Sequence, residues 1–441
     1  DLTADHAYKV GRFLGWYYNA LRERNGNNEP ARIVIGKDTR RSSYMFEYSL
    51  VAGLTASGAD AYLLHVTTTP SVAYIARVDD FDCGIMISAS HNPYYDNGIK
   101  LIDCYGEKMP EETLLLVEDY IDGKLHVFDK EWPELPFAHR EHIGCTVDYV
   151  AGRNRYMGYL ISLGIYSFKG VKVGLDCANG ASWNIAKSVF DALGADTYVI
   201  NNKPNGLNIN NNAGSTHIEG LQKFVVENGL DVGFAFDGDC DRVAVLERGR
   251  TLDNDRLLFA LAKYMSENGM LRKDMVVGTV LTNRGVEMAL NGLNLRLLRS
   301  DVGDANVFHL MSKKGVNLGG ERSGHFLLSD FATGSDALLN ALFFAKIYRE
   351  KGSLFDYTAG YKNVPCREKS INVTPQQLKS MKNSSYFEKV AGEVRALFGG
   401  VKLVLRASGT EPKVRIYIEG EDAGEIEEAM RHTAWQISDF V

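Results

Sequence analysis

Three aspartates at alternate positions, Asp237, Asp239 and Asp241 in FDGDCDR, give the strongest chemical signal in the sequence. They follow the apolar run VGFAF, typical of a buried strand, and alternate side chains of extended backbone share one side. Crowded carboxylates repel one another unless a cation is present, and hard oxygen ligands favour magnesium or calcium. An EF-hand calcium loop does not fit, because Arg242 and Arg248 occupy the positions of its turn glycine and bidentate glutamate. We therefore expect a site for a hard divalent cation, with an acidic solvated turn as the alternative.

A second candidate segment, ISASHNPYYDNGIK, places Ser90 and His91 after the apolar run CGIMI. A GxSxG motif does not surround the serine, so the pattern does not support a serine hydrolase. A hydroxyl beside a metal site can instead carry a phosphoryl group, because the metal neutralises the charge that develops. Lys100 could supply a positive charge or transfer a proton. The alternative is a polar turn with a structural histidine.

Two further segments suit the binding of a sugar and of an anion. In GGERSGH, Glu321 and Ser323 offer an acceptor and a hydroxyl, and His325 is a candidate acid or base. RASGTEPKVR clusters donors around a tight turn, which describes an anion cradle; an ordinary hairpin turn is the alternative. The cradle residues are Arg406, Ser408, Gly409, Thr410 and Arg415.

These segments lie in a chain that repeats one plan at the level of domains. IVIGKDTR, VKVGLDCANG and VVGTVLTNRG each read as a buried strand followed by a loop and a helix. Such alternation predicts mixed or mostly parallel sheets covered by helices, with ligands at the loops that follow strands. The last stretch reads as two strands and an amphipathic helix. The predicted domains are residues 1–148, 149–250, 251–365 and a smaller α+β domain at 366–441, arranged around a central cleft.

Composition excludes several other classes of protein. The 441 residues are 45% apolar with a net charge of −7, which argues against a nucleic-acid binder. No apolar run approaches the roughly 20 residues that span a bilayer. Six scattered cysteines without CxxC spacing are expected to be reduced and mostly core-packed, which favours a cytoplasmic protein.

The four segments, in this order, resemble those of the α-D-phosphohexomutase family. IGKDTRRSS, TTTPSVAYIAR and PNGLNINNNAGSTH extend the similarity over essentially the whole chain. The resemblance implies three α/β domains and a smaller C-terminal domain around one cleft. It also implies that Ser90 is a phosphoserine whose oxygen completes a magnesium site with the three aspartates. Arg242 then lies beside the metal loop, and Arg40 and His91 are active-site neighbours.

The remaining roles are likewise implied by the resemblance. Lys100 and His325 match residues of proton transfer, Glu321 and Ser323 match the sugar-binding loop, and the cradle matches the loop that holds the non-reacting phosphate. The similarity favours the bacterial branch that interconverts glucosamine 6-phosphate and glucosamine 1-phosphate for cell-wall precursors, with a sugar 1,6-bisphosphate as intermediate and activator. Glucose or mannose phosphates, a non-catalytic sugar-phosphate binder and a phosphatase are the alternatives. We expect a monomer or homodimer.

Departures from the family pattern concern single positions and the start of the chain. The chain begins at Asp1, just after the place of an FGTDGIRG-like segment that carries an active-site arginine. Cys240 replaces a usual glycine or alanine at a position that is not a ligand. Ala305 stands where an arginine is common, and Arg322 where a glutamine is common, so both bear on the preferred sugar.

Overall fold

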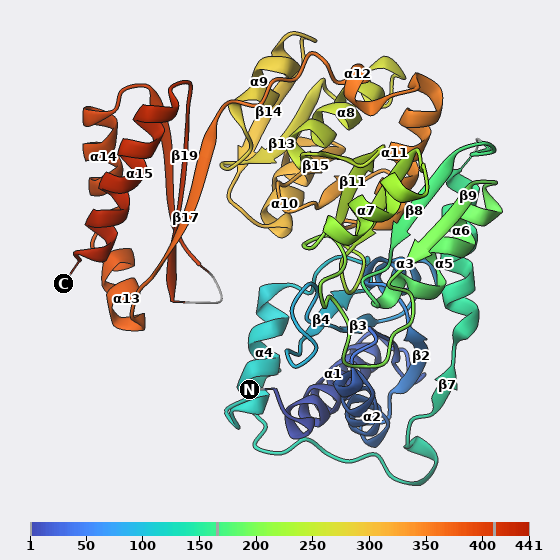
Figure 1. Ribbon diagram of the computed structural model, residues 1–441. Coiled ribbons are helices and arrows are strands. Elements are labelled where there is room, and N and C mark those ends of the chain that lie inside the picture. Colours follow the sequence, from blue (N-terminus) through green and yellow to red (C-terminus); the bar gives the residue numbers. More distant parts are fainter. Residues whose placement is uncertain (1, 165–166, 409–411, 441) are drawn as a thin grey trace.

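The chain folds into four successive units, each built on its own sheet, in a computed structural model that describes residues 2–164, 167–408 and 412–440 (Figure 1). The first unit, in blue and cyan, lies at one end of the molecule in this view. The second and third, in green and yellow, lie together, and the fourth, in red, packs beside the third. Mixed sheets covered by helices and a smaller α+β unit confirm the predicted fold class.

The first unit is a five-stranded sheet with helices on both faces. Its strands are β1 (Arg32–Lys37), β2 (Asp60–Val66), β3 (Cys83–Ile87), β4 (Ile99–Asp103) and β7 (Thr146–Asp148), in the order β4-β3-β1-β2-β7. Its helices are α1 (Ala4–Arg24), α2 (Arg41–Ala56), α3 (Thr69–Val78) and α4 (Glu111–Ile121), and β5 (His126–Val127) pairs with β6 (Lys130–Glu131). Strand β1 contributes to the hydrophobic core on each face of the sheet, because alternate residues of a strand point to opposite faces. Ile33 and Ile35 pack in one core with α1 and α2, while Val34 packs with Val72 of α3.

The second unit carries the aspartate segment between two neighbouring strands. Its strands are β8 (Lys172–Asp176), β9 (Asp196–Ile200), β10 (Val232–Phe236), β11 (Val243–Glu247) and β12 (Arg250–Leu252), in the order β12-β11-β10-β8-β9. Its helices are α5 (Val150–Leu163), α6 (Ala186–Ala192) and α7 (Glu219–Glu227). β10 is parallel to β8 but antiparallel to β11, so the chain reverses sharply at residues 237–242. β12 crosses the predicted domain limit at 250.

The third unit shares a continuous hydrophobic core with the second. Its strands are β13 (Met275–Thr279), β14 (Arg296–Ser300), β15 (Leu318–Gly320) and β16 (Phe326–Leu328), in the order β14-β13-β15-β16. Its helices are α8 (Asn254–Glu267), α9 (Arg284–Asn291), α10 (Asp304–Lys314), α11 (Ala337–Lys351) and α12 (Leu354–Tyr357). Phe190 and Phe234 of the second unit belong to the same buried cluster as Phe326 and Phe344 of the third. This common core fixes the two units against each other.

The fourth unit is an antiparallel sheet covered on one face by helices (Figure 1). Its elements are β17 (Cys366–Asn372), α13 (Pro375–Asn383), α14 (Tyr386–Leu397), β18 (Val401–Ala407), β19 (Lys413–Gly420) and α15 (Ala423–Ser438). Its core, with Val394, Ile416 and Ala429, is a separate buried cluster. Polar contacts join it to the third unit: Glu419 accepts from the backbone N of Arg284 at the start of α9, at 3.1 Å.

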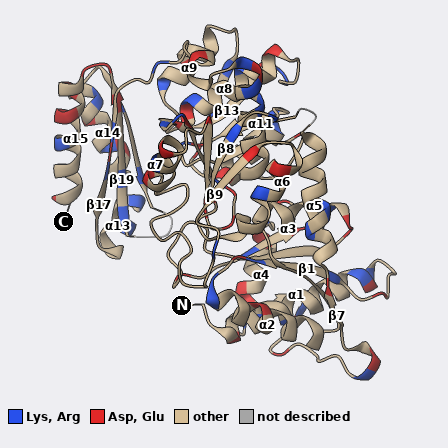
Figure 2. Ribbon diagram, turned by 45° about the vertical axis from the view of Figure 1, so that its right-hand side comes forward, with Lys and Arg blue, Asp and Glu red and all other residues tan. Residues whose placement is uncertain are grey.

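Charge and cysteine placement only partly follow expectation. Figure 2 shows acidic and basic residues interspersed over the elements. In the part of the chain that the structure describes, no helix is long and apolar enough to cross a membrane.

All six thiols are free, but Cys104 and Cys145 are exposed and Cys366 is partly buried, so the expectation of mostly core-packed cysteines is wrong for half of them.

Candidate active site

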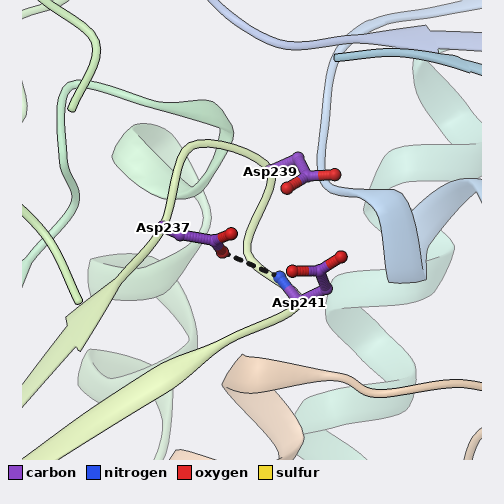
Figure 3. Close-up of side chains that lie close together, drawn as sticks. All are labelled: Asp237, Asp239 and Asp241. Atoms are coloured by element: carbon purple, nitrogen blue, oxygen red, sulfur yellow. Dashed lines mark hydrogen bonds between the residues drawn. The ribbon is translucent and has the colours of Figure 1, made fainter. Parts of the chain in front are cut away.

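The three aspartates lie in a tight turn between β10 and β11 (Figure 3). The expectation that extended backbone aligns them is wrong: the chain reverses here, because β11 runs antiparallel to β10. Asp237 Oδ1 closes the turn by accepting from the backbone N of Asp241 at 3.1 Å and of Arg242 at 3.2 Å. Cys240 has φ +64°, a conformation that glycine adopts without strain, which explains why glycine suits this position.

The turn gathers three carboxylates into a small space. One oxygen from each aspartate lies within 4.8 Å of the others. Burial, together with Asp241 and Asp239, raises the pKa of Asp237. Burial acts in the same direction on Asp241, but Lys100 and His325 outweigh it and hold its pKa well below the usual range. Among the described residues, Oδ1 of Asp239 and of Asp241 are buried without a hydrogen-bond partner. Hard oxygen donors with unpaired buried atoms fit a magnesium ion.

Ser90 of the first unit meets this turn. It follows β3 in a left-handed conformation, with φ +51°, and its backbone N donates to Ser88 Oγ at 2.9 Å. Its Oγ donates to Asp237 Oδ2 at 2.6 Å. The hydroxyl expected to carry a phosphoryl group therefore lies directly beside the expected metal ligands.

Lys100 reaches the same carboxylates from the neighbouring strand β4. Its Nζ lies 2.6 Å from Asp239 Oδ2 and 3.1 Å from Asp241 Oδ2. Burial alone would lower the pKa of Lys100, but the two carboxylates raise it well above its ordinary value. The side chain is thus held as an ammonium ion that can donate a hydrogen bond or a proton.

His325 brings the third unit to the aspartates. Its Nε2 lies 3.5 Å from Asp241 Oδ1 and 3.1 Å from Arg242 Nε, and its Nδ1 lies 3.1 Å from Glu321 Oε2. Burial lowers the pKa of His325, but Asp241 and Glu321 raise it to about 10. Ser323 Oγ lies 3.2 Å from Nδ1 on the same side as Glu321. The ring is therefore fixed between two carboxylates, which favour its protonated form, while the positive charge of Arg242 opposes it.

A cavity of about 720 Å³ lies against these groups, lined from three units by Ser90, Lys100, Asp241, Arg242 and His325. Glu321 and Ser323 are not among the described lining residues; both contact Nδ1 of His325. Ala305 lines this cavity, so it can contact a substrate.

The neighbours of Ser90 occupy two different settings. Arg40 is buried beneath the serine loop, where Nη2 donates to the carbonyl of Asn92 at 2.6 Å. His91 is partly buried, and burial and the charge of Arg242 lower its pKa. Arg40 therefore shapes the loop rather than facing the cavity.

Arg322 points away from the cavity, toward the fourth unit. Its Nε lies 3.3 Å from Asp255 and its Nη1 donates to Glu368 of β17 at 2.7 Å. Its guanidinium also lies over the ring of Tyr417. This departure from the family pattern thus concerns the junction between two units, and Ala305 is the departure that faces the substrate space.

Arg406, Ser408 and Arg415, the described residues of the fourth predicted loop, do not line this cavity. Arg406 and Arg415 are directly paired across β18 and β19, and Arg406 lines a separate cavity of about 610 Å³ with Val302 and Phe387. Burial and the charge of Arg415 lower the pKa of Arg406. Ser408 is buried, and its backbone N donates to Lys413 at 2.8 Å; Gly409 and Thr410 lie outside the described residues. Opposed like charges favour an anion at this position.

Sequence reasoning assigned no role to Thr69 and Asn210, which contact the site. Thr69 N donates to the backbone O of Asp239 at 3.0 Å, and its hydroxyl donates to the Asp239 carboxylate. Asn210 donates to the carbonyl of Ser90. Thr69 stands at the first turn of α3, after the cap residue Thr68 and before Pro70, and that helix-start pattern was the available signal.

Comparison with known proteins defines the class of this chain. Domains I, II and III of phosphoglucomutase/phosphomannomutase, each described as alpha/beta/alpha, match residues 1–126, 155–250 and 253–363, and the C-terminal domain of that family matches residues 362–434. The chain belongs to the phosphoglucomutase/phosphomannomutase family, which confirms the resemblance and makes it a phosphohexomutase.

Particular relatives narrow the comparison. The phosphoglucosamine mutase of Lachnospira eligens is 53% identical over 98% of this chain and 93% of its own length. That of Caldicellulosiruptor bescii is 40% identical over 97% and 93%. A phosphoglucomutase/phosphomannomutase family protein from Burkholderia thailandensis has the same fold, with a TM-score of 0.80 at 22% identity over 99% of this chain and 94% of that one.

The aspartate turn generates the first prediction. Asp239→Asn and Asp241→Asn should each weaken Mg²⁺ binding, measured by titration calorimetry, and abolish most turnover. The double variant should lose little more than either single variant, because the residues act as one unit. Asp196→Asn, an exposed change on β9 of the same unit, is the control and should match wild type. Unchanged Mg²⁺ affinity in Asp239→Asn, or full activity in excess chelator, contradicts the assignment.

Proposed function

We propose that the chain interconverts glucosamine 6-phosphate and glucosamine 1-phosphate with Ser90 as the phosphoryl carrier. The observation that carries the proposal is the hydrogen bond of 2.6 Å from Ser90 Oγ to Asp237. It joins a nucleophilic hydroxyl to a cation site, which is the arrangement that phosphoryl transfer requires. The choice of glucosamine rests on the phosphoglucosamine mutases to which the chain is 53% and 40% identical.

The reaction consists of two transfers in opposite directions. Phosphorylated Ser90 gives its phosphoryl group to the free hydroxyl of the sugar phosphate, so the Ser90 O–P bond breaks and a sugar O–P bond forms. The product is a 1,6-bisphosphate. It reverses its orientation in the cavity and returns its other phosphoryl group to Ser90. In each transfer the accepting hydroxyl loses a proton and the departing oxygen gains one.

The residues around the carrier have separate tasks. Asp237, Asp239, Asp241 and the Ser90 oxygen would hold Mg²⁺, which supplies positive charge that stabilises the transferring phosphoryl group. Lys100 and His325 are assigned to proton transfer, and the neighbouring carboxylates raise the pKa of both. The group that donates to the departing oxygen in one direction accepts the proton in the other.

The fourth unit supplies the clamp for the phosphate that is not reacting. Arg406, Ser408, Gly409, Thr410 and Arg415 are assigned to this role, since guanidinium groups bind phosphate with charge-assisted hydrogen bonds. Because Arg406 lines a separate cavity, the fourth unit must approach the main cavity when substrate binds. Closure would also exclude water, which would otherwise discharge phosphorylated Ser90.

Glucose or mannose phosphate is the second candidate substrate. Ala305 favours this alternative, because it lines the cavity and stands at a position where an arginine is common in the family pattern. Intact Ser90 and metal ligands weigh against a protein that only binds sugar phosphates, because binding alone needs neither group. A sugar 1,6-bisphosphate is the expected activator, since it can phosphorylate Ser90.

The covalent carrier is tested by mass. A fraction of active enzyme should be about 80 Da heavier than the unmodified chain, the mass of one phosphate group, with the modification on Ser90. Ser90→Ala should lose this species and nearly all turnover. Ser88→Ala is the comparison variant. Ser88 Oγ accepts a hydrogen bond from the backbone N of Ser90, but Ser88 is not the proposed site of phosphorylation. Normal activity in Ser90→Ala contradicts the mechanism.

Sugar preference is tested with purified enzyme and the 1-phosphates and 6-phosphates of glucosamine, glucose, mannose and N-acetylglucosamine. We expect kcat/KM for glucosamine phosphate to exceed the others by at least about tenfold, because a hydrogen bond to a charged group contributes about 1.5 kcal/mol or more. A higher kcat/KM for glucose or mannose phosphate would reverse the assignment of substrate and leave the chemistry in place.

The phosphate clamp distinguishes a mutase from a phosphatase. Arg406→Ala should raise KM and lower kcat together, because one guanidinium both binds and orients the phosphate. The variant should also require more added sugar 1,6-bisphosphate, since the intermediate escapes more often. Arg431→Ala, on the exposed side of α15 in the same unit, should behave as wild type. If Arg406→Ala leaves both constants and the bisphosphate requirement unchanged, the loop is not the clamp.

A further inference from the structure

A long loop of the second unit, residues 201–218 between β9 and α7, reaches over the first unit (Figure 1). Gly206 in this loop accepts from the backbone N of Arg41 at 3.0 Å. Nearby, Thr39 Oγ1 donates to the backbone O of Asn179 at 2.5 Å. The contact between the units is therefore already secured by bonds that do not involve Ser90.

Asn210 lies in the same loop and points into the turn that carries Ser90. The residue is buried, with 7% of its surface exposed, and its backbone N donates to Ala178 at 2.8 Å. Its side-chain Nδ2 donates to the carbonyl of Ser90 at 2.8 Å and to the carbonyl of Asn92 at 3.0 Å. Both donor hydrogens of one amide are thus used on the backbone of the serine loop.

The same two carbonyls are held from the other side by Arg40. Its Nη2 donates to Ser90 O at 3.2 Å and to Asn92 O at 2.6 Å, while its Nη1 pairs with Asp38. A carbonyl oxygen has two lone pairs. Each carbonyl therefore accepts one bond from the first unit and one from the second.

The hydrogen bonds from Asn210 and Arg40 restrain Ser90, a residue in an unfavourable backbone conformation. Ser90 has φ +51°, a left-handed conformation that is unfavourable for a residue with a side chain and persists only where its surroundings enforce it. The loops are also packed tightly: a Cβ added at Gly238 would lie 2.5 Å from Ser90 O and 2.9 Å from Asn210 Nδ2. The direction of Ser90 Oγ toward Asp237 depends on this backbone.

We propose that Asn210 is a positioning residue for the phosphoryl carrier, contributed by the unit that holds the metal ligands. It fixes the left-handed turn at Ser90 so that Oγ stays on Asp237. Asn210 is not among the described residues that line the main cavity, so it acts on the transfer step rather than on substrate binding. The proposal rests on the function of Ser90 proposed above.

The test uses Asn210→Asp, which keeps the shape of the side chain and replaces the donor group by an acceptor. Asp also tolerates the left-handed backbone of Asn210, whose φ is +57°. We expect kcat, and the rate at which glucose 1,6-bisphosphate phosphorylates Ser90, to fall roughly a hundredfold, as misplacement of a reacting group does. KM for glucosamine 6-phosphate should stay within about twofold of wild type, because Asn210 does not line the described cavity. Affinity for Mg²⁺ should fall no further than in Ser90→Ala, because the Ser90 oxygen is one of the four expected ligands.

Asn208→Asp is the matched control in the same loop. Asn208 makes two local side-chain bonds, accepting from Asn205 N at 2.9 Å and donating to Lys203 O at 3.1 Å, and does not contact the described atoms of the serine loop through its side chain. It should leave kcat and Ser90 phosphorylation as in wild type. If Asn210→Asp fails to fold by circular dichroism, Asn210→Gly removes the donors without adding charge. It should lower kcat about tenfold, less than Asn210→Asp, because Arg40 still holds both carbonyls and no carboxylate is placed against them.

Several results would overturn the proposal. Turnover of Asn210→Asp within about threefold of wild type would show that the grip is not needed; so would equal losses in Asn210→Asp and Asn208→Asp, which indicate loop stability alone. A loss of Mg²⁺ affinity greater than that of Ser90→Ala would instead assign Asn210 to the metal loop. If wild type itself never carries phosphate on Ser90, the proposed function fails, and this proposal with it. That result is visible without any Asn210 variant.

Discussion

The close approach of three aspartates and one serine hydroxyl is the constraint on which the rest of the site depends. Asp237, Asp239 and Asp241 offer oxygens within 4.8 Å of one another, two of these residues being buried. Gathering like charges away from water is costly unless opposite charge compensates them. Lys100 and His325 supply part of that charge from two other units, and Oδ1 of Asp239, buried without a hydrogen-bond partner among the described residues, remains available to a cation.

This charge balance explains why the units are joined as they are. Ser90 lies on the first unit, the three aspartates on the second and His325 on the third, so the relative positions of these units must be stable for the site to form. A continuous core fixes the second unit to the third, and Thr69 and Asn210 tie loops of the first and second together. The fourth unit has its own core and meets the third through polar contacts such as Arg322 with Glu368. Interfaces of this kind permit relative motion of domains.

Much of this organisation was predictable from local sequence. Repeated strand–loop–helix segments predicted the α/β units, because buried strands and loops follow from apolar runs and their punctuation. The chemistry of Ser90, Lys100 and the aspartates followed from residue type, and the family from the order of four segments. The backbone of the aspartate segment was mispredicted, since alternation alone cannot distinguish a strand from a turn closed by bonds to Asp237.

The sequence by itself therefore determined the fold class and the family, and it supplied the prediction of which groups react. Tertiary structure alone decided which residues hold those groups: Asn210 grips a carbonyl 120 residues away in the chain, and Arg322 turns from the cavity to Glu368. It also placed Arg406 on a cavity apart from Ser90. Such contacts depend on how separate loops meet in space. An asparagine or arginine that forms them has no pattern in the neighbouring residues that would reveal its role.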